Sequence, residues 1–181
     1  STAYGTAANW DTNAIPDPFT NVVIADVTND PLMAANEELY SLTINSGGVL
    51  DTEGFNLTFK DSGTFVNNGT FRLKGNETLT SFTNDTDTGT VIYDGTTSIT
   101  GLSAGNTYND LTFDGSGGTW TLGAALDVND DLTITTGTLD VSGSNYGITV
   151  GGDWTDTGAG TFTEGSGTVT FDVTGGTINS N

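Results

Sequence analysis

The stretch "NDLTFDG" at residues 109–115 decides the fold, because its pattern of a leucine, a threonine and a second apolar residue recurs along the chain. In each copy two apolar residues alternate with a threonine, which is the period of a β-strand with one buried face. A polar residue, mostly Asn or Asp, precedes the strand in most copies. The close copies are "YSLTINSG" (40–47), "FNLTFKDSG" (55–63), "NDDLTITT" (129–136) and "YGITVGG" (146–152).

Blocks that begin with such a strand and continue into a turn rich in Gly, Ser, Asn or Asp follow one another from residue 38 to residue 181. One block of this size cannot bury its apolar face alone, whereas stacked blocks place Leu on Leu and Phe on Phe in ladders about 4.8 Å apart. The recurrence therefore predicts an all-β fold, a parallel β-helix (β-solenoid) of roughly seven to eight coils. An antiparallel β-sandwich is the alternative, although it does not require one tetrapeptide to recur.

Residues 1–37 differ from the repeats. They contain all three prolines and an irregular apolar run, "NVVIADV" (21–27). Because the terminal coil of a solenoid has an open edge that an atypical segment covers, we expect residues 1–37 to form an N-terminal cap or entry segment and residues 38–181 to form the repeats. We also expect one helical turn within "AANEELY" (34–40). The sequence "GGTINSN" at the other end shows no such change, which predicts that another chain or a further segment completes the last coil.

The chain is strongly acidic, with 3 Lys+Arg against 23 Asp+Glu and a net charge of −20. Such a polyanion repels phosphate groups, so nucleic acid and anionic membrane surfaces are excluded as partners. No segment has the ~18 consecutive apolar residues of a membrane-spanning helix. Cysteine and histidine are absent, which excludes disulfides, thiol catalysis and imidazole metal ligation.

The order of these motifs, from "PDPFTNVVI" (16–24) through the LTF-like copies to "GTFTEGSGTVTFD" (160–172), resembles the repetitive β-solenoid regions of large secreted bacterial surface and adhesin-like proteins. The resemblance extends over nearly the whole chain. It implies a right-handed parallel β-helix, export to the cell surface or the extracellular space, and a structural or adhesive role. The opening "STAYGTAANW" fits a mature secreted form without a signal peptide.

Two acidic loops are candidates for binding Ca²⁺, the one ion that the sequence suggests; no cofactor is required. They offer the carboxylate and carbonyl oxygens that Ca²⁺ prefers. Neither matches the twelve-residue Ca²⁺ loop or the Ca²⁺-binding nonapeptide, and Asx turns, in which Asp or Asn bonds its own backbone, are the favoured explanation of both. The candidate ligands are Asp127, Asn129, Asp130 and Asp131 in one loop and Asp85 and Asp87 in the other.

The same aspartates are the candidates for an enzyme that cleaves polysaccharides. Such chemistry needs a carboxylic acid of raised pKa beside an ionised carboxylate. These residues lie in polar turns that water should reach, so we expect a protein without enzymatic activity.

Other motifs are less specific. Four Asn-x-Ser/Thr triplets, which are potential glycosylation sites, begin at Asn56, Asn68, Asn76 and Asn84. The three tryptophans could stack on sugar rings. Thr-x-Thr pairs occur in several blocks, but an ice-binding solenoid needs the pair in every coil.

The leading functional hypothesis is a non-enzymatic extracellular structural protein, a solenoid subunit that self-associates end to end into a surface filament or adhesin. The alternative is an adhesin module that binds carbohydrate or a host surface, with a polysaccharide as its partner. For assembly we expect contacts from Val22, Val23 and Ile24 near one end and from Val169, Phe171 and Ile178 near the other.

Overall fold

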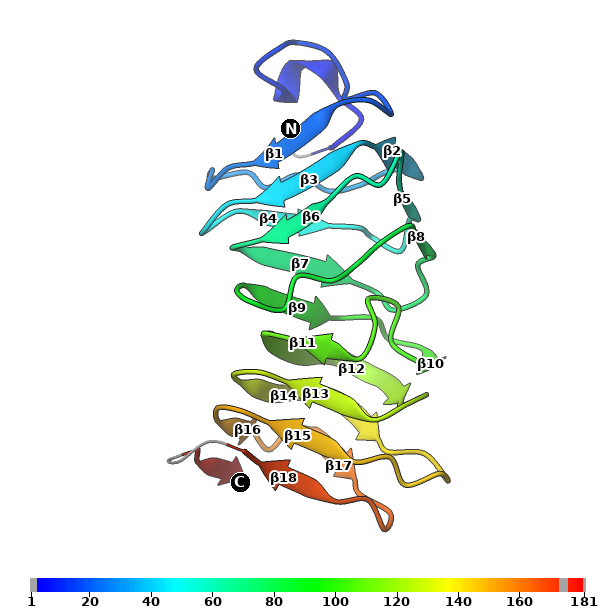
Figure 1. Cartoon of the computed structure of the whole chain (residues 1–181), viewed down its shortest axis with the longest axis vertical. Coiled ribbons are helices and arrows are strands. Elements are labelled where there is room, and N and C mark those ends of the chain that lie inside the picture. The colour runs from blue at the N-terminus through cyan, green and yellow to red at the C-terminus, as the bar shows by residue number, and fades with distance from the viewer. Residues whose placement is uncertain (1–2, 173–175, 181) are drawn as a thin grey trace.

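The structure is a computed structural model that describes residues 3–172 and 176–180. It is an all-β solenoid of about seven turns, whose strands stack along one long axis (Figure 1). Every strand pairing is parallel, which confirms the predicted solenoid and excludes the β-sandwich. Among the described residues the only helical element is a short 3₁₀ turn, η1 (Ala7–Asn9). No helix there combines the length and the apolar character that crossing a membrane requires.

Two sheets form what we call the front face, the column of strands nearest the viewer in Figure 1. The first contains β1 (Asn21–Ile24), β3 (Ser41–Ile44) and β6 (Phe65–Asn67). The second contains β11 (Thr107–Tyr108), β13 (Leu126–Val128), β15 (Ile148–Val150) and β18 (Val169–Phe171). Residues 81–88 lie between β6 and β11 without forming a strand, so the front face is interrupted at this level.

A nine-stranded sheet lies behind the front face and continues around the next corner of the coil. Its main path runs through β4 (Val49–Asp51), β7 (Thr70–Leu73), β9 (Thr90–Tyr93), β12 (Asp110–Thr121), β14 (Leu132–Asp140), β16 (Trp154–Asp156) and β19 (Ile178–Ser180). The second halves of β12 and β14 pair with β10 (Ser98–Thr100) and β17 (Gly160–Thr163), respectively.

A three-stranded sheet of β2 (Glu37–Leu39), β5 (Leu57–Phe59) and β8 (Leu79–Thr80) closes the coils of the N-terminal half. The helical turn expected within residues 34–40 is therefore wrong. Glu37–Leu39 pairs with Leu57–Phe59, and Leu39 is fully buried. Pairing with the neighbouring coil overrides the local helical preference of a short Ala- and Glu-rich stretch.

The recurring tetrapeptide forms ladders of buried side chains. Leu111 of β12 aligns with Leu132 of β14, which aligns with Trp154 of β16, and all three face the interior. Phe113 continues the next ladder onto Ile134. The threonine between the apolar residues, Thr112 in β12 and Thr133 in β14, points away from the core. One strand pattern is reused because every coil must present the same cross-section to the next.

The coils approach one another closely at one corner, where glycines stack. A Cβ atom added to Gly95 would overlap the backbone oxygen of Lys74 in the preceding coil, and one added to Gly115 would overlap that of Gly95. Only glycine permits this approach of backbone to backbone.

The front face ends in open strands. No described strand pairs with the second edge of β1 or of β18. On the neighbouring face the N-terminal end is covered, because Ala3 bridges Leu32 and Tyr4 is buried. The front-face ladder begins at β1, inside the segment 1–37, and the division at residue 37 stays a prediction.

Candidate functional site

Aspartates at the corner between the front face and the nine-stranded sheet connect successive coils. Oδ1 of Asp110 accepts a hydrogen bond from the backbone N–H of Asp131 at 3.2 Å. Oδ1 of Asp131 accepts one from the N–H of Asp153 at 2.7 Å. Asp153 in turn accepts from the backbone N–H and the hydroxyl of Thr177, both at 2.8 Å. We call Asp110, Asp131, Asp153 and Thr177 the aspartate ladder.

The ladder explains the polar residue that precedes the repeated strand. At this corner the backbone N–H groups leave the regular pairing of the sheet, and a buried or half-buried N–H without an acceptor is costly. An Asp placed one coil earlier supplies the acceptor. The amides of Asn36 and Asn56 do the same before β5 and β8, accepting from the N–H groups of Asn56 at 2.9 Å and Thr78 at 2.7 Å.

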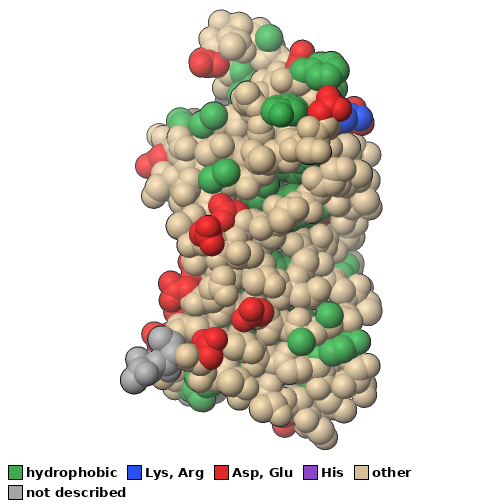
Figure 2. All heavy atoms as spheres, viewed as in Figure 1, with side chains coloured by type: hydrophobic (Ala, Val, Ile, Leu, Met, Phe, Trp, Pro, Cys, Tyr) green, Lys and Arg blue, Asp and Glu red, His purple; other side chains and the backbone are tan. Residues whose placement is uncertain are grey.

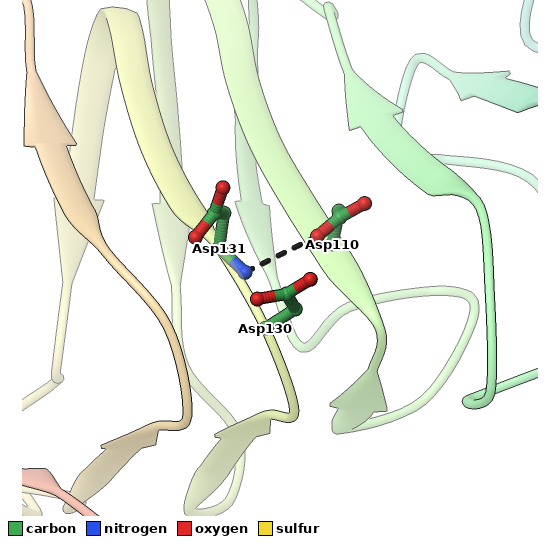
Figure 3. Close-up of side chains that lie close together, drawn as sticks. All are labelled: Asp110, Asp130 and Asp131. Carbon is green, nitrogen blue, oxygen red and sulfur yellow. Dashed lines mark hydrogen bonds between the residues drawn. The ribbon is translucent and has the colours of Figure 1, made fainter. Parts of the chain in front are cut away.

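Three carboxylates of this corner form a cluster (Figure 3). One oxygen from each of Asp110, Asp130 and Asp131 lies within 4.8 Å of the others. Asp110 is half-buried, whereas Asp130 and Asp131 are exposed. We call these three residues the acidic cluster. Figure 2 shows further acidic side chains spread over the visible face.

The acidic cluster is electrostatically strained. Desolvation raises the pKa of Asp130, and the negative charges of Asp131, Asp110 and Asp153 raise it further. Hydrogen bonds from the backbone and the hydroxyl of Thr177 lower the pKa of Asp153. A divalent cation between the three carboxylates would relieve their repulsion, and carboxylate oxygens are the ligands that Ca²⁺ prefers.

Of the four residues that the sequence suggested as Ca²⁺ ligands in the loop 127–131, only two lie in the acidic cluster. Asp130 and Asp131 belong to the cluster, but Asp127 lies on the exposed side of β13 and is not in it. The side-chain amide of Asn129 donates a hydrogen bond to the backbone oxygen of Thr86 at 2.8 Å. This bond ties the end of β13 to the segment 81–88, which interrupts the front face. Asp110 was not among the candidates, although "NDLTF" and "DDLTI" align it with Asp131.

The second predicted loop lies in the interruption of the front face. Asp85 is engaged in the fold, because its two carboxylate oxygens accept from the N–H groups of Asn67 at 2.9 Å and Asp87 at 3.1 Å. Phe82 is half-buried, packs against the core at this level and contacts Phe65 with a centroid distance of 4.9 Å.

A groove lies beside this segment, along β6, and we call it the central groove. Aromatic, amide and carboxylate groups share its lining. Such a combination suits polar ligands with an apolar face. Residues of its lining include Phe65, Asn68, Phe82, Asn84, Asp85 and Asp87.

The basic residues form ion pairs in the N-terminal half. Asp94 contacts Lys74 Nζ at 3.0 Å through one oxygen and Arg72 Nη2 at 3.0 Å through the other. Lys74 also lies 3.7 Å from Asp51, and the pair of Lys60 with Glu38 measures 3.0 Å. All three basic side chains of the chain thus have acidic partners. Among the described residues, the acids with a basic partner are Asp94, Asp51, Glu53 and Glu38.

Arg72, Lys74, Asp51 and Asp94 form what we call the ion-pair cluster, in which burial and neighbouring charges shift the pKa values of Asp51 and Lys74. Desolvation raises the pKa of Asp51, although the N–H of Glu53 and the charge of Lys74 oppose the shift. Desolvation alone would lower the pKa of Lys74, but its hydrogen bond to Asp94 and the surrounding carboxylates outweigh it and raise the pKa. The charged form of the Lys74 amine is therefore favoured in the folded protein, whereas burial disfavours the ionised form of the Asp51 carboxyl group.

Comparison with known proteins assigns the chain to a family. Residues 1–103 match a family model described as a domain of unknown function (DUF8693). The chain belongs to this family. No curated protein and no solved structure matches the chain.

The part matched by DUF8693 includes the ion-pair cluster and the central groove. The acidic cluster and the whole aspartate ladder lie beyond residue 103. The family description names no activity, so it adds no functional assignment to either place.

The four Asn-x-Thr triplets all lie in the DUF8693 region and differ in their surroundings. Asn56 accepts from Thr78, Asn68 accepts from the hydroxyl of Thr88 at 3.1 Å, and Asn84 donates to the backbone oxygen of Thr107 at 2.9 Å. Asn76 is exposed. Their glycosylation stays a prediction.

The tryptophans serve packing. Trp120 and Trp154 are buried in the core, and Trp10 packs edge-on against Tyr4 with a centroid distance of 4.9 Å. Of the residues expected at assembly contacts, Val22 and Ile24 face the core, Val169 and Phe171 are half-buried, and Val23 and Ile178 are exposed. Only the last two present their side chains to solvent.

Proposed function

We propose that the protein is a non-enzymatic, extracellular structural module, a β-solenoid subunit that associates end to end with further copies in a surface filament or adhesin. The observation that carries the proposal is the open front face. The second edges of β1 and β18 have no partner among the described strands. The N–H and C=O groups of such edges are templates for adding another strand.

The two ends differ, so a contact between them is heterologous. Contacts of this kind propagate into a filament unless a rotation closes them into a ring. Exposed apolar side chains lie near both ends, since Val23 is 54% exposed and Ile178 is 64% exposed. Several exposed hydrophobic side chains are visible around the N-terminal end in Figure 2.

Charge opposes this association. The net charge is −20, and the three basic side chains are already paired within the chain. Repulsion between copies weakens when salt or a divalent cation screens it. Assembly should therefore increase with ionic strength, and Ca²⁺ should promote it at lower concentration than Na⁺.

Electron microscopy and sedimentation velocity of the purified chain test the proposal in low salt, in high NaCl, in CaCl₂ and in EDTA. We expect filaments or longer oligomers with salt or Ca²⁺. Monomers in all four conditions would contradict end-to-end association. In a variant with Asp110→Asn and Asp130→Asn, loss of the Ca²⁺ response with an unchanged NaCl response would place the cation at the acidic cluster.

The structural role of the corner aspartates supports the non-enzymatic part of the proposal. Oxygens of Asp110, Asp131 and Asp153 accept backbone hydrogen bonds that hold the coils together. Incubation with acidic and neutral polysaccharides, followed by an assay for new reducing ends and unsaturated products, is expected to show no turnover. The extracellular location is tested by treating intact source cells with protease, which should remove the protein from their surface.

Carbohydrate binding is the second candidate function, and the central groove favours it. Its lining offers amide and carboxylate groups for sugar hydroxyls beside the aromatic ring of Phe82. A glycan array followed by calorimetry tests this function. We expect Asp87→Asn to weaken binding, and Asp127→Asn, a matched change on the same face outside the groove, to leave it unaltered. An array without any bound glycan would remove this candidate.

A further inference from the structure

A second groove runs along the open edge of β1. One wall is formed by the segment 9–17 that precedes the strand, and the other by β1 and the residues after it. In Figure 1 this segment lies above β1 at the N-terminal end. The lining is largely apolar and includes Trp10, Ile15, Pro16, Val23 and Val27. We call it the N-terminal groove.

The bottom of the N-terminal groove could accept one further β-strand beside β1. Val22 and Ile24 point inward and stack on Leu42 and Ile44 of β3. A strand added to the outer edge of β1 would continue both ladders if it carried an apolar residue at every second position. The segment 9–17 leaves this position open, although residues 3 and 4 fill the equivalent position on the neighbouring face.

The other end of the same column carries a strand of that pattern. Val169 and Phe171 of β18 are half-buried and align with Ile148 and Val150 of β15, while Thr170 between them is exposed. No described strand pairs with the second edge of β18. The chain thus presents at its C-terminal end the apolar–Thr–apolar strand that its N-terminal groove would accept.

We propose that β18 of one copy enters the N-terminal groove of the next copy and pairs in parallel with its β1. The register places Val169 beside Val22, Thr170 beside Val23 and Phe171 beside Ile24. This inference rests on the proposed end-to-end association and specifies its joint, its polarity and its register. The occupant of the groove is a second copy of this chain.

The joint requires β19 to move. When β18 occupies the level before β1, β19 and Ala3 of the next copy compete for the same position beside β16. Ile178 of β19 is 64% exposed although it aligns with the buried Trp154, whereas Tyr4, next to Ala3, is buried. The better-packed segment displaces the other, so Ala3 and Tyr4 of the next copy replace β19 beside β16.

Engineered cysteines test this joint, because the chain has no native cysteine. A disulfide forms only when two Cα atoms come within about 7 Å. The Val23→Cys and Thr170→Cys proteins are mixed under assembly conditions, treated with a mild oxidant and separated on a non-reducing gel. We expect a band of doubled mass from this mixture. The matched control replaces the first protein by Val66→Cys, an exposed position on β6 in the middle of the same face, and we expect no band above background.

The outcomes separate the two proposals. Filaments without a Val23–Thr170 cross-link above the control would overturn this joint and leave end-to-end association standing. Absence of both filaments and cross-link would overturn both. A Thr170→Cys chain that lacks residues 176–181 should cross-link at least as efficiently as the full chain, and a clear loss of cross-linking would overturn the displacement of β19.

Discussion

The side chain of Asp131 accepts the backbone N–H of Asp153, 22 residues later in the chain, at 2.7 Å. This bond joins equivalent corners of two successive coils, since Leu132 and Trp154, the residues that follow, are aligned partners in the sheet. The aspartate ladder therefore links the repeat in the sequence to the stacking of the coils. It also gathers negative charge at one corner, so the same residues stabilise the fold and strain it.

Replacing Asp131 with Ala should destabilise the protein more than replacing it with Asn. Alanine leaves the N–H of Asp153 without its acceptor, which costs about 1 kcal/mol for a partly exposed hydrogen bond. Asparagine keeps an oxygen acceptor and removes one negative charge. Urea denaturation at low ionic strength measures the difference in the free energy of unfolding. Equal losses for both variants would mean that the hydrogen bond is not what Asp131 contributes.

Replacing Asp130 with Asn should stabilise the protein at neutral pH. The pKa of Asp130 is raised in the folded state by desolvation and then by neighbouring carboxylates, so its ionised form is disfavoured there. This cost is fully present above the folded pKa and disappears as the pH falls below the unfolded value. Because the side chain is largely exposed, we expect a gain of only about 0.5 kcal/mol.

The pH dependence distinguishes this effect from a change in packing. The difference in unfolding free energy between the Asp130→Asn protein and the wild type should shrink as the pH is lowered from 7 to about 3, where Asp130 is protonated in both states. High salt should shrink it as well. A gain that persists at low pH and in high salt would refute the electrostatic explanation.

Replacing Glu77 with Ala should be among the most destabilising polar changes. Glu77 is 5% exposed, and its carboxyl group accepts from the N–H groups of Lys74 at 2.6 Å and Gly75 at 2.7 Å and from the hydroxyl of Thr52 at 2.6 Å. Alanine would leave these donors without an acceptor in a buried turn, at a cost of about 3 kcal/mol.

The matched change for Glu77 is Glu53→Ala, which removes an exposed carboxylate of the same ion-pair region. Its salt bridge to Lys74 spans 3.6 Å at the surface and should contribute no more than about 0.5 kcal/mol. Thermal and urea denaturation of the two variants, run side by side, measure the contrast. Similar small losses would show that water satisfies the donors around residue 77.

Alanine at Gly95 should disrupt stacking of the coils, whereas alanine at Gly143 should not. A Cβ at Gly95 would overlap the backbone oxygen of Lys74, and backbone cannot move aside as the end of a flexible side chain can. No atom lies within 4 Å of a Cβ at Gly143, and its φ is not in the left-handed region. We expect a loss of about 2 kcal/mol or more for Gly95→Ala and a change within about 0.5 kcal/mol for Gly143→Ala. Circular dichroism melting curves decide between these expectations.

The sequence alone supports much of the fold. The copies around Leu42, Leu57, Leu111 and Leu132 predict parallel stacking, because identical short strands with one apolar face fit a repeating cross-section. Their inward residues are buried as expected. The strand at Glu37–Leu39 was missed, since its local composition favours a helix and only the pairing with Leu57–Phe59 makes it a strand.

The candidate sites were only partly predictable. Asp130 and Asp131 were identified because several acidic residues lie close together in the loop 127–131. Asp110 joins them through the register of β12 and β14, across about 20 residues of sequence. Asp127 is adjacent in sequence and yet excluded, because alternation along β13 turns it to another side. The interruption at residues 81–88 has no local marker that distinguishes it from any other Asp- and Thr-rich turn.

By itself the sequence determined the period of the coil, the face of each strand that is buried, and the acidity of the surface, since these depend on residues close together in the chain. Only the tertiary structure decided which carboxylates meet, which faces end in open strands, and where the grooves lie. Those features depend on the offset between one coil and the next, and that offset is set by turns of unequal length whose summed geometry no local pattern contains.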